Sequence, residues 1–320
     1  MLIKEDFEIK NYTSFKIGGK IAKVYFPEKF EDMKNLPEKI AVIGNLSNTL
    51  VSSFGFSGAV FSTSKLDEIF TSPHPSPKLG EGAGVNELAN FTPAGEVKHK
   101  TVIIAGAGVK GPKLAQTAAE YGLSGFEFMI GFPGSVGGEV FMNAGAHGQC
   151  IADVFKSAKI YDGENIKTLT KSEMEFSYRH SICQDKNYIV LEAEFELTPD
   201  NPEKIKQKMT ENLEFRKAHQ PSLVLPNCGS IFKNPENNSA GKLLDGCGVK
   251  DLQIGGAKVW ENHANFIVND GNATSTDVLQ LMLEMQKRVN EKFGIELLPE
   301  IRYLGDNKDE VELCKKLRVL

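Results

Sequence analysis

One stretch of the chain combines many glycines with a few polar side chains, which suits a ligand that lies directly against the backbone. It runs from Gly131 to Gly148 and contains six glycines. Glycine has no Cβ atom, so phosphate oxygens can approach and accept hydrogen bonds from main-chain N–H groups. Pro133 stiffens the approach to the turn, and the Asn143 amide can donate to and accept from the edge of a heteroaromatic ring. The stretch predicts a cofactor site, with a glycine-rich structural loop as the alternative.

A polar turn nearer the N-terminus has the composition of a pyrophosphate-binding loop. Gly44-Asn45-Leu46-Ser47-Asn48 follows a short apolar run. Its serine and asparagine side chains can wrap a pyrophosphate together with backbone amides, although an ordinary hairpin can carry the same turn residues.

Two further polar residues could act on a substrate. Arg179 is followed by small polar residues and could clamp a carboxylate bidentately, although a lone arginine on a turn is more often part of a surface salt bridge. Ser230 follows a glycine, with Lys233 nearby on a predicted strand. The G-x-S-x-G elbow of the hydrolases is absent, and no His/Asn pairing supports Cys228 as a nucleophile.

A formal dinucleotide-binding motif lies between a predicted strand and a predicted helix. Gly106 to Gly111 has the spacing G-x-G-x-x-G, and Glu127 lies near the offset of a ribose-binding acid. A doubly wound domain would continue with strand–helix units, whereas here the glycine-rich stretch and β-rich segments follow. We therefore favour a fold that is not of the Rossmann type, and keep a NAD-binding Rossmann protein as an alternative.

The overall composition narrows the class of protein. At 320 residues, with 41% hydrophobic and 25% charged residues, the chain is ordinary for a soluble globular protein of two or three domains. The net charge of −5 argues against a broad nucleic-acid footprint. No apolar run approaches the roughly 20 residues that span a bilayer, and the N-terminus lacks the apolar core of a signal peptide. We expect neither nucleic acid nor membrane as a partner.

Cysteine and histidine usage predicts no metal site. The five cysteines are scattered and never spaced C-x-x-C, and the histidines show no H-x-x-x-H pattern. This usage fits reduced thiols in the cytoplasm.

Hydrophobic periodicity predicts two long helices. The first is 202–219, with Pro221 as its stop, and the second is Asp277–Phe293, ended by Gly294. We interpret the apolar stripe of the second helix as core. Shorter helices are predicted at 28–35, 111–121 and 240–246, and a capping-box pattern at Ser172-x-x-Glu175 predicts a short helical turn. Strands are predicted at 21–26, 40–43, 101–105, 156–161, 167–170, 189–197 and 300–304.

Two segments are predicted to lie outside the core. From about Thr71 to Lys98 proline, glycine and serine dominate, which predicts a disordered, dispensable surface insertion, with an active-site lid as the alternative. The segment after Gly305 is charged and is expected to be peripheral.

Taken together, these motifs resemble the UDP-N-acetylenolpyruvoylglucosamine reductases, flavoproteins of bacterial peptidoglycan synthesis. The resemblance covers about Asn11 to Gly305, apart from the insertion, and the short path from Arg179 to Ile189 is similar to the subclass with a short connection after the Tyr-Arg motif. Its most specific parts are Gly131–Gly148, Tyr178-Arg179-x-Ser181, Arg216-x-x-x-Gln220-Pro221, Gly229-Ser230-x-Phe232-Lys233-Asn234-Pro235, His263-Ala264-Asn265-Phe266 and Pro299-Glu300.

The resemblance implies an α+β fold: a two-subdomain FAD-binding fold of the vanillyl-alcohol-oxidase/PCMH type, with a C-terminal α/β substrate-binding domain. The implied boundaries are 1–66 and 101–201 for the FAD-binding subdomains, 67–100 for the insertion, 202–306 for the substrate domain and 307–320 for a tail. The residues implied to bind FAD are Gly44, Asn45, Ser47, Asn48, Gly134, Ser135, Gly138 and Asn143.

The implied activity is an NADPH-dependent, FAD-mediated reduction of UDP-N-acetylglucosamine enolpyruvate to UDP-N-acetylmuramate. This is an oxidoreductase that acts on a CH–CH group with NADP as acceptor, in the cytoplasm, and it serves cell wall biogenesis, cell shape and cell division. Arg179 and Glu300 match the positions that stabilise an enolate, and Ser230 matches the proton donor to C2. The substrate-binding residues expected are Lys233, Asn234, Arg216 and Gln220, the last two of which could equally fix the helix end. We expect a monomer.

Two positions depart from the family pattern, and one of them is Ser53, near which members often have an acidic residue. Leu46 stands where members usually have glycine, and a Cβ atom disfavours positive φ, so the first FAD loop is expected to take a different path. Two other functions stay open: a flavin oxidoreductase of the same fold that acts on an alcohol, and a catalytically dead nucleotide-binding protein.

Overall fold

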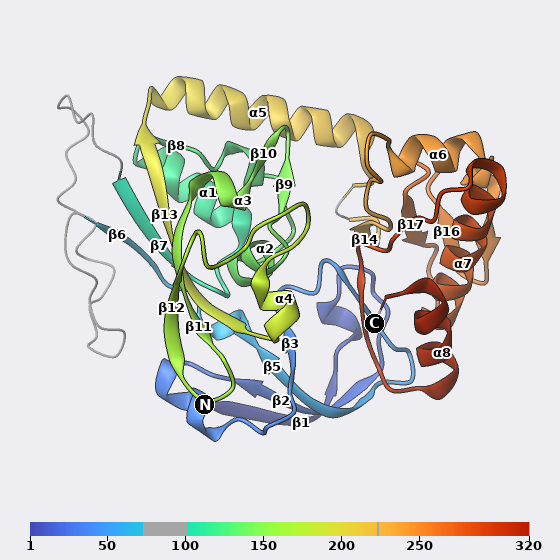
Figure 1. Cartoon of the computed structure of the whole chain (residues 1–320), viewed down its shortest axis with the longest axis horizontal. Coiled ribbons are helices and arrows are strands. Elements are labelled where there is room, and N and C mark those ends of the chain that lie inside the picture. Colours follow the sequence, from blue (N-terminus) through green and yellow to red (C-terminus); the bar gives the residue numbers. More distant parts are fainter. Residues whose placement is uncertain (73–100, 223, 320) are drawn as a thin grey trace. The chain divides into compact units, whose positions relative to one another are not determined.

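The computed structural model describes residues 1–72, 101–222 and 224–319 (Figure 1). The chain divides into two compact units, each built from discontinuous segments. Unit 1 contains Met1–Leu2, Tyr25–Asn45 and Phe61–Arg216, and unit 2 contains Ile3–Val24, Leu46–Val60 and Lys217–Leu320. The domain boundaries given above stay a prediction.

The main sheet of unit 1 is antiparallel throughout. Its strands are, in spatial order, β12 (Ile166–Thr170), β11 (Phe155–Tyr161), β13 (Ile189–Pro199), β7 (Thr101–Gly106) and β6 (Ile69–Ser72), and β8 (Leu123–Ser124) pairs with the end of β13. A doubly wound Rossmann domain is built on a parallel sheet, so this topology confirms the predicted α+β class and excludes the Rossmann alternative for unit 1.

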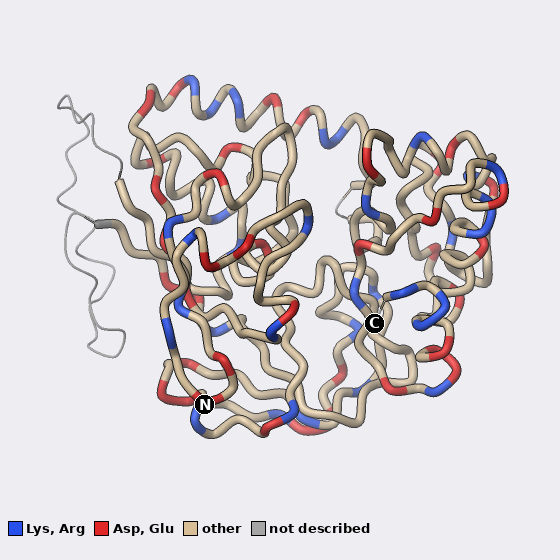
Figure 2. Tube along the Cα trace, in the orientation of Figure 1, with Lys and Arg blue, Asp and Glu red and all other residues tan. Residues whose placement is uncertain are grey.

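The helices of unit 1 pack small and apolar side chains. They are α1 (Gly111–Glu120), α2 (Val136–Phe141), α3 (Ile151–Val154), α4 (Ile182–Lys186) and most of α5 (Pro202–His219). In α1 the buried residues Leu114, Ala115 and Ala118 form the predicted apolar face, and Gly122 follows the helix with φ 63°. Charged residues of both signs follow one another along α5, while Ile205 and Met209 are buried (Figure 2).

The residues of the G-x-G-x-x-G motif serve packing in unit 1. A Cβ atom on Gly106 would lie 2.3 Å from the Leu66 carbonyl oxygen, and one on Gly108 would lie 2.2 Å from that of Thr63. Glu127 is buried and accepts hydrogen bonds from the Ser124 hydroxyl at 2.6 Å and the Gly125 N–H at 2.8 Å. The glycines therefore allow two backbone segments to touch, and the glutamate closes a turn.

Four more strands form a sheet in the order β1–β2–β5–β3. Their bounds are β1 (Leu2–Glu8), β2 (Lys20–Phe26), β5 (Phe56–Ser62) and β3 (Ala41–Ile43). Short 3-10 helices occur at η1 (Lys10–Tyr12), η2 (Phe30–Asn35), η3 (Thr63–Lys65), η5 (Glu127–Met129) and η6 (Val249–Asp251), and β9 (Gly145–Ala146) pairs with β10 (Gln149–Cys150). The helix predicted at 28–35 is thus a 3-10 helix.

Unit 2 packs a small antiparallel sheet with helices. The sheet order is β14 (Asn227–Ser230), β17 (Phe266–Asn269), β16 (Ala257–Val259) and β15 (Gln253–Ile254). The helices are α6 (Ala240–Gly246), α7 (Ser275–Phe293) and α8 (Lys308–Leu317), and β18 (Arg302–Leu304) pairs in parallel with β4 (Thr49–Val51).

Helix α7 matches its prediction closely. Thr274 caps its N-terminus in a capping box with Asp277, and Gly294 ends it in the left-handed conformation. The apolar stripe is buried core, as interpreted from the sequence: Val278, Leu281, Met282, Met285 and Val289.

Three local predictions are wrong. Residues 171–175 form a helical turn, in which the Met174 N–H donates to the Thr170 carbonyl oxygen at 3.1 Å, but the capping box of Ser172 and Glu175 is wrong because Glu173 accepts from the Thr170 N–H. The segment after Gly305 is not peripheral, since α8 buries Glu310, Cys314 and Leu317. Residues Ile69–Ser72, predicted as the start of the insertion, form β6, whereas 73–100 lie outside the described residues.

Within the described ranges, no helix has both the length and the apolar character needed to cross a bilayer.

Candidate functional site

In unit 1 the first polar turn and the glycine-rich stretch lie against each other. The Asn45 side-chain amide donates to the Pro133 carbonyl oxygen, and a Cβ atom on Gly44 would lie 2.5 Å from Ser135 Oγ. Ser135 precedes α2, but its hydroxyl makes no cap hydrogen bond to that helix. The structure therefore brings together Gly44, Asn45, Gly134 and Ser135, four of the predicted FAD residues.

Around these glycines, buried polar atoms lack partners. Among the described residues, buried side-chain oxygens without a hydrogen bond occur only in Thr63, Ser135 and Glu139, and both carboxyl oxygens of Glu139 are included. A buried polar group without a partner costs about 1–3 kcal/mol, so folded proteins rarely keep several. Beside backbone that is bare of side chains, this set fits a cofactor rich in phosphates and hydroxyls, such as FAD.

Burial raises the pKa of the Glu139 carboxyl group to about 8. A Cβ atom on Gly111 would lie 2.3 Å from Glu139 Oε1, and one on Gly134 would lie 3.0 Å from the same oxygen. The carboxyl group therefore occupies space that side chains at both positions would need.

The Asn143 amide makes two hydrogen bonds inside unit 1. Its Nδ2 donates to the Ser177 carbonyl oxygen at 2.8 Å, and its Oδ1 accepts from the Ala152 N–H at 3.0 Å. The residue is 5% exposed and has φ 43°. Its side chain thus ties the end of α2 to the turn that carries Arg179.

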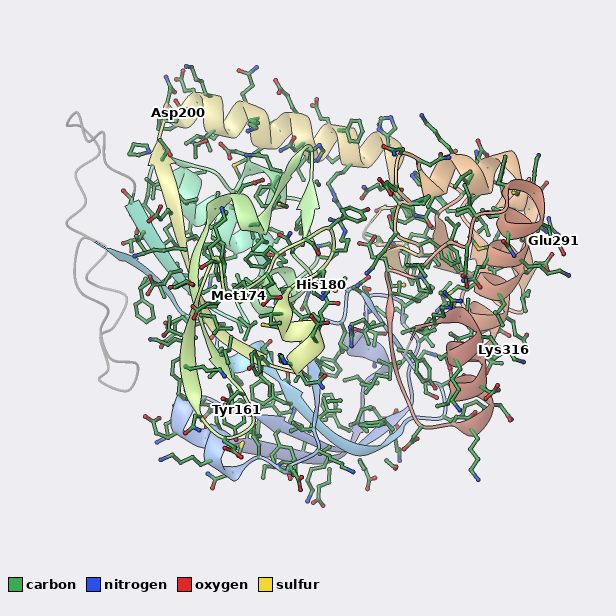
Figure 3. The ribbon with its side chains drawn as sticks, viewed as in Figure 1. Tyr161, Met174, His180, Asp200, Glu291 and Lys316 are labelled. Atoms are coloured by element: carbon green, nitrogen blue, oxygen red, sulfur yellow. The ribbon has the colours of Figure 1, made fainter. Side chains whose placement is uncertain are left out.

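Arg179 is presented by a two-residue turn. Ser177 and His180 exchange both backbone hydrogen bonds at 3.2 Å, which leaves Tyr178 and Arg179 at the tip. Arg179 has φ 57°, its Nη2 donates to the Gly145 carbonyl oxygen at 3.0 Å, and its guanidinium lies 5.1 Å from the Tyr178 ring centre. His180, labelled in Figure 3, pairs with Asp185 of α4 at 3.1 Å.

Arg216 belongs to unit 1 and packs on the glycine-rich stretch. A Cβ atom on Gly131 would lie 2.3 Å from Arg216 Cδ, and the guanidinium lies 5.7 Å from the Phe132 ring centre. Burial lowers the pKa of Arg216, and burial together with the arginine charge lowers that of His147. These contacts support a positioning role for Arg216 at the start of the loop.

The second half of the first turn lies in unit 2, where Leu46 has the left-handed conformation. Its φ is 51°, it is 5% exposed, and its carbonyl oxygen accepts from Ser14 N at 3.3 Å. The expectation of a loop that avoids positive φ is wrong at this residue. Ser47 follows it and is half-buried.

In unit 2, Ser230 ends β14 after a bulge. Gly229 has φ 79°, and its N–H donates to Asn227 Oδ1 at 2.9 Å. The next residues are braced by the buried Asn265, which exchanges hydrogen bonds with the Phe232 backbone at 2.8 and 3.0 Å. In the part of the chain that the structure describes, the half-buried Ser230 hydroxyl has no hydrogen-bond partner.

Glu300 lies two residues before β18, in the segment that bonds to the residues after Ser230. The Glu300 N–H donates to the Ile231 carbonyl oxygen at 2.8 Å, and Pro299 bridges to Phe232. Asn48 Nδ2 donates to the Glu300 carbonyl oxygen at 3.0 Å. Unit 2 thus brings together Ser230, Glu300 and Asn48, and the Asn48 side chain is hydrogen-bonded to the Glu300 backbone.

The remaining predicted residues are distributed along the same unit and α2. Asn234 Oδ1 accepts from the Ala240 N–H at 3.0 Å, at the start of α6, and the Lys233 N–H donates to the Leu298 carbonyl oxygen at 2.8 Å. Gln220 is half-buried, and Gly138 is exposed near Ser135 on α2.

Two residues of the site were missed. Thr63 carries no motif, and Glu139 was passed over although it is the one charged residue between Gly131 and Phe141. That isolation within an apolar, glycine-rich segment was the available signal. In the described ranges, no cluster of three or more metal-ligating side chains occurs.

Two family models match the chain. One, the FAD binding domain, matches residues 31–166, and the other, the C-terminal domain of UDP-N-acetylenolpyruvoylglucosamine reductase, matches residues 220–304.

Curated proteins and a solved structure agree with these matches. A UDP-N-acetylenolpyruvoylglucosamine reductase from Caldanaerobacter subterraneus subsp. tengcongensis is 42% identical over 306 residues, covering 93% of this chain and 92% of the relative. One from Lactococcus lactis subsp. cremoris is 37% identical, covering 96% of each. The crystal structure of UDP-N-acetylenolpyruvylglucosamine reductase from Thermus caldophilus has a TM-score of 0.74 at 31% identity, covering 95% of this chain and 100% of that one.

Proposed function

The chain belongs to the family of UDP-N-acetylenolpyruvoylglucosamine reductases, and we propose that it reduces UDP-N-acetylglucosamine enolpyruvate to UDP-N-acetylmuramate with NADPH. The observation that supports the proposal is the backbone hydrogen bond from Glu300 to Ile231, the residue after Ser230, which places Glu300 next to the segment that carries the serine. These two residue types at one place suit the protonation of a reduced double bond.

The bound FAD supplies the hydride chemistry that links NADPH to the enolpyruvyl group. Gly44, Asn45, Gly134 and Ser135 would hold it, because they combine bare backbone with unpaired hydroxyl groups. Ser47, Asn48 and Gly138 are proposed to extend this contact. Asn143 would act through its backbone, since its amide already bridges Ser177 and Ala152.

Arg179 and Glu300 are proposed to stabilise the enolate that develops on the substrate. The turn at Ser177–His180 fixes the Arg179 backbone, and its guanidinium can pair with a carboxylate. Glu300 is the second residue proposed for this role, and the hydrogen bond from its N–H to the Ile231 carbonyl oxygen fixes its backbone.

Ser230 is proposed to donate the proton to C2. A serine hydroxyl is a weak acid, but an enolate carbon is basic enough to take a proton from a donor that is correctly placed. The bulge at Gly229 and the brace from Asn265 hold this hydroxyl in position.

The substrate diphosphate is proposed to bind Lys233, Asn234 and Gln220, with Arg216 as a further candidate. Lys233 offers a cation, while Arg216 also positions Gly131 and Phe132. We further propose that the protein acts as a monomer in the cytoplasm, without nucleic acid or membrane as partners, and supplies a peptidoglycan precursor needed for cell wall biogenesis, cell shape and division.

The test separates the two half-reactions. In the Ser230→Ala variant, NADPH should still bleach the flavin at the wild-type rate, while reoxidation by the UDP-linked enolpyruvyl sugar should slow by orders of magnitude. Stopped-flow absorbance measures both rates. The Ser222→Ala variant, which alters an exposed serine in the same unit, is the matched control.

An equal loss in both half-reactions would contradict the role of Ser230 as proton donor. Bleaching by NADPH with no reoxidation by the substrate in wild-type protein would favour a flavin oxidoreductase that acts on an alcohol. A colourless protein that ignores added FAD would favour a catalytically dead one.

A further inference from the structure

We propose that Glu139 is a further FAD-binding residue, whose carboxylic acid donates a hydrogen bond to an oxygen acceptor of the bound cofactor. The inference rests on the FAD site and not on the reaction proposed above. It is therefore tested without the substrate.

The first observation is the position of the carboxyl group. Glu139 is 3% exposed and lies on α2, four residues after Ser135 and five after Gly134. A Cβ atom placed on Gly134 would lie only 3.0 Å from Glu139 Oε1. The carboxyl group is thus next to backbone that the FAD-binding loop provides.

The second observation is that both oxygens have no hydrogen-bond partner among the described residues. Glu192, another buried glutamate of unit 1, instead pairs with Lys159 at 2.9 Å. A buried carboxyl group that is left without a partner in the protein is explained if a ligand supplies one.

The surroundings of Glu139 determine whether its carboxyl group is protonated. Charged residues lie on the elements packed against α2, but burial alone sets the direction of the Glu139 pKa, which is raised to about 8. These charged residues are Lys110 and Lys113 at α1, Asp153 of α3, Asp185 and Lys186 of α4, and Glu192, Glu194 and Glu196 of β13. At neutral pH the group is therefore mostly protonated and can donate to a phosphate or carbonyl oxygen, whereas the ionised group would repel a phosphate.

The proposal makes FAD affinity depend on pH. Because the donor is lost on ionisation, affinity falls as pH rises through the pKa of Glu139, up to tenfold per pH unit above it. A variant without this side chain lacks the donor at every pH, so its FAD affinity should not vary with the ionisation of residue 139.

The experiment measures FAD release from the holoenzyme. Wild type, Glu139→Gln, Glu139→Ala and Glu192→Gln, each saturated with FAD, are diluted at pH 7 and pH 9, and the fluorescence of released FAD gives the Kd. Glu192→Gln is the matched control, since burial also raises the pKa of that carboxyl group, which already has a partner in Lys159.

For wild type and Glu192→Gln we expect the Kd to rise about tenfold from pH 7 to pH 9. Glu139→Gln keeps a donor and should bind FAD equally at both pH values. Glu139→Ala should bind about tenfold more weakly than wild type at pH 7.

Two results would overturn the proposal: wild-type affinity in Glu139→Ala, or wild-type pH dependence in Glu139→Gln. The glutamine variant keeps the size of the side chain, so it decides the matter even if the alanine variant does not fold. Failure to reduce the enolpyruvyl sugar would contradict only the proposed reaction.

Discussion

Two buried glutamates, one in each unit, differ in how they are satisfied. Glu310 of α8 is 1% exposed and accepts hydrogen bonds from four hydroxyl groups, those of Ser52, Ser275, Thr276 and Tyr303. Glu139 of α2 is 3% exposed and accepts none among the described residues. A buried carboxylate with all its partners holds a fold together, whereas one without partners marks a place where a ligand completes the structure.

The largest loss of stability from removal of a side chain is expected at Glu310. Glu310→Ala leaves four hydroxyl groups without their acceptor, and those of Ser52 and Ser275 belong to fully buried residues, so the free energy of unfolding should fall by roughly 3 kcal/mol. Urea denaturation of the holoenzyme measures this loss. The folded fraction should bind FAD with the Kd of the wild type. A large change in FAD affinity with little change in stability would mean that Glu310 does not differ from Glu139 in the way proposed.

Glu139 is expected to act on stability through pH. Its folded pKa of about 8 exceeds its ordinary value of 4.5, so the folded state binds more protons than the unfolded state between these values. The stability contributed by Glu139 is full below pH 4.5 and falls by up to about 1.4 kcal/mol per pH unit until the pH passes its folded pKa.

The Glu139→Leu variant isolates this contribution. Leucine has a similar size and no charge, so in protein stripped of FAD the difference between the variant and wild type should grow in favour of the variant from pH 5 to pH 8. Urea denaturation at several pH values checks the slope. A difference that does not vary with pH would mean that Glu139 is satisfied in the folded chain.

The smallest effect is expected at Leu46, where the backbone is strained. An L-residue at φ 51° costs about 1 kcal/mol relative to glycine. Both Leu46→Gly and Leu46→Ala lose the buried side chain, but the glycine variant should be more stable than the alanine variant by about 1 kcal/mol. Thermal unfolding of the two variants gives the comparison, and an alanine variant of equal or higher stability would show that the left-handed conformation costs nothing here.

The elements with strong local signals were predictable. Pro202 and Pro221 bracket α5, and Thr274 and Gly294 bound α7, because caps and prolines act within a few residues of themselves. The family motifs also indicated the FAD-binding class, which the matches to residues 31–166 and 220–304 confirm. The helix α2 was missed because its glycines have low helix propensity and only packing stabilises it.

The sequence alone determined the ends of the long helices, the apolar faces and the glycines that leave backbone bare, since each depends on neighbours within one or two turns. The tertiary structure decided which polar groups are buried and which of them have hydrogen-bond partners. Ser52 meets Glu310 across 258 residues of chain, and no local pattern encodes that meeting. From the sequence, Glu139 is indistinguishable from an ordinary surface charge. In the folded chain it is buried beside Gly111 and Gly134 and has no hydrogen-bond partner among the described residues, because burial and hydrogen bonding are properties of the whole fold.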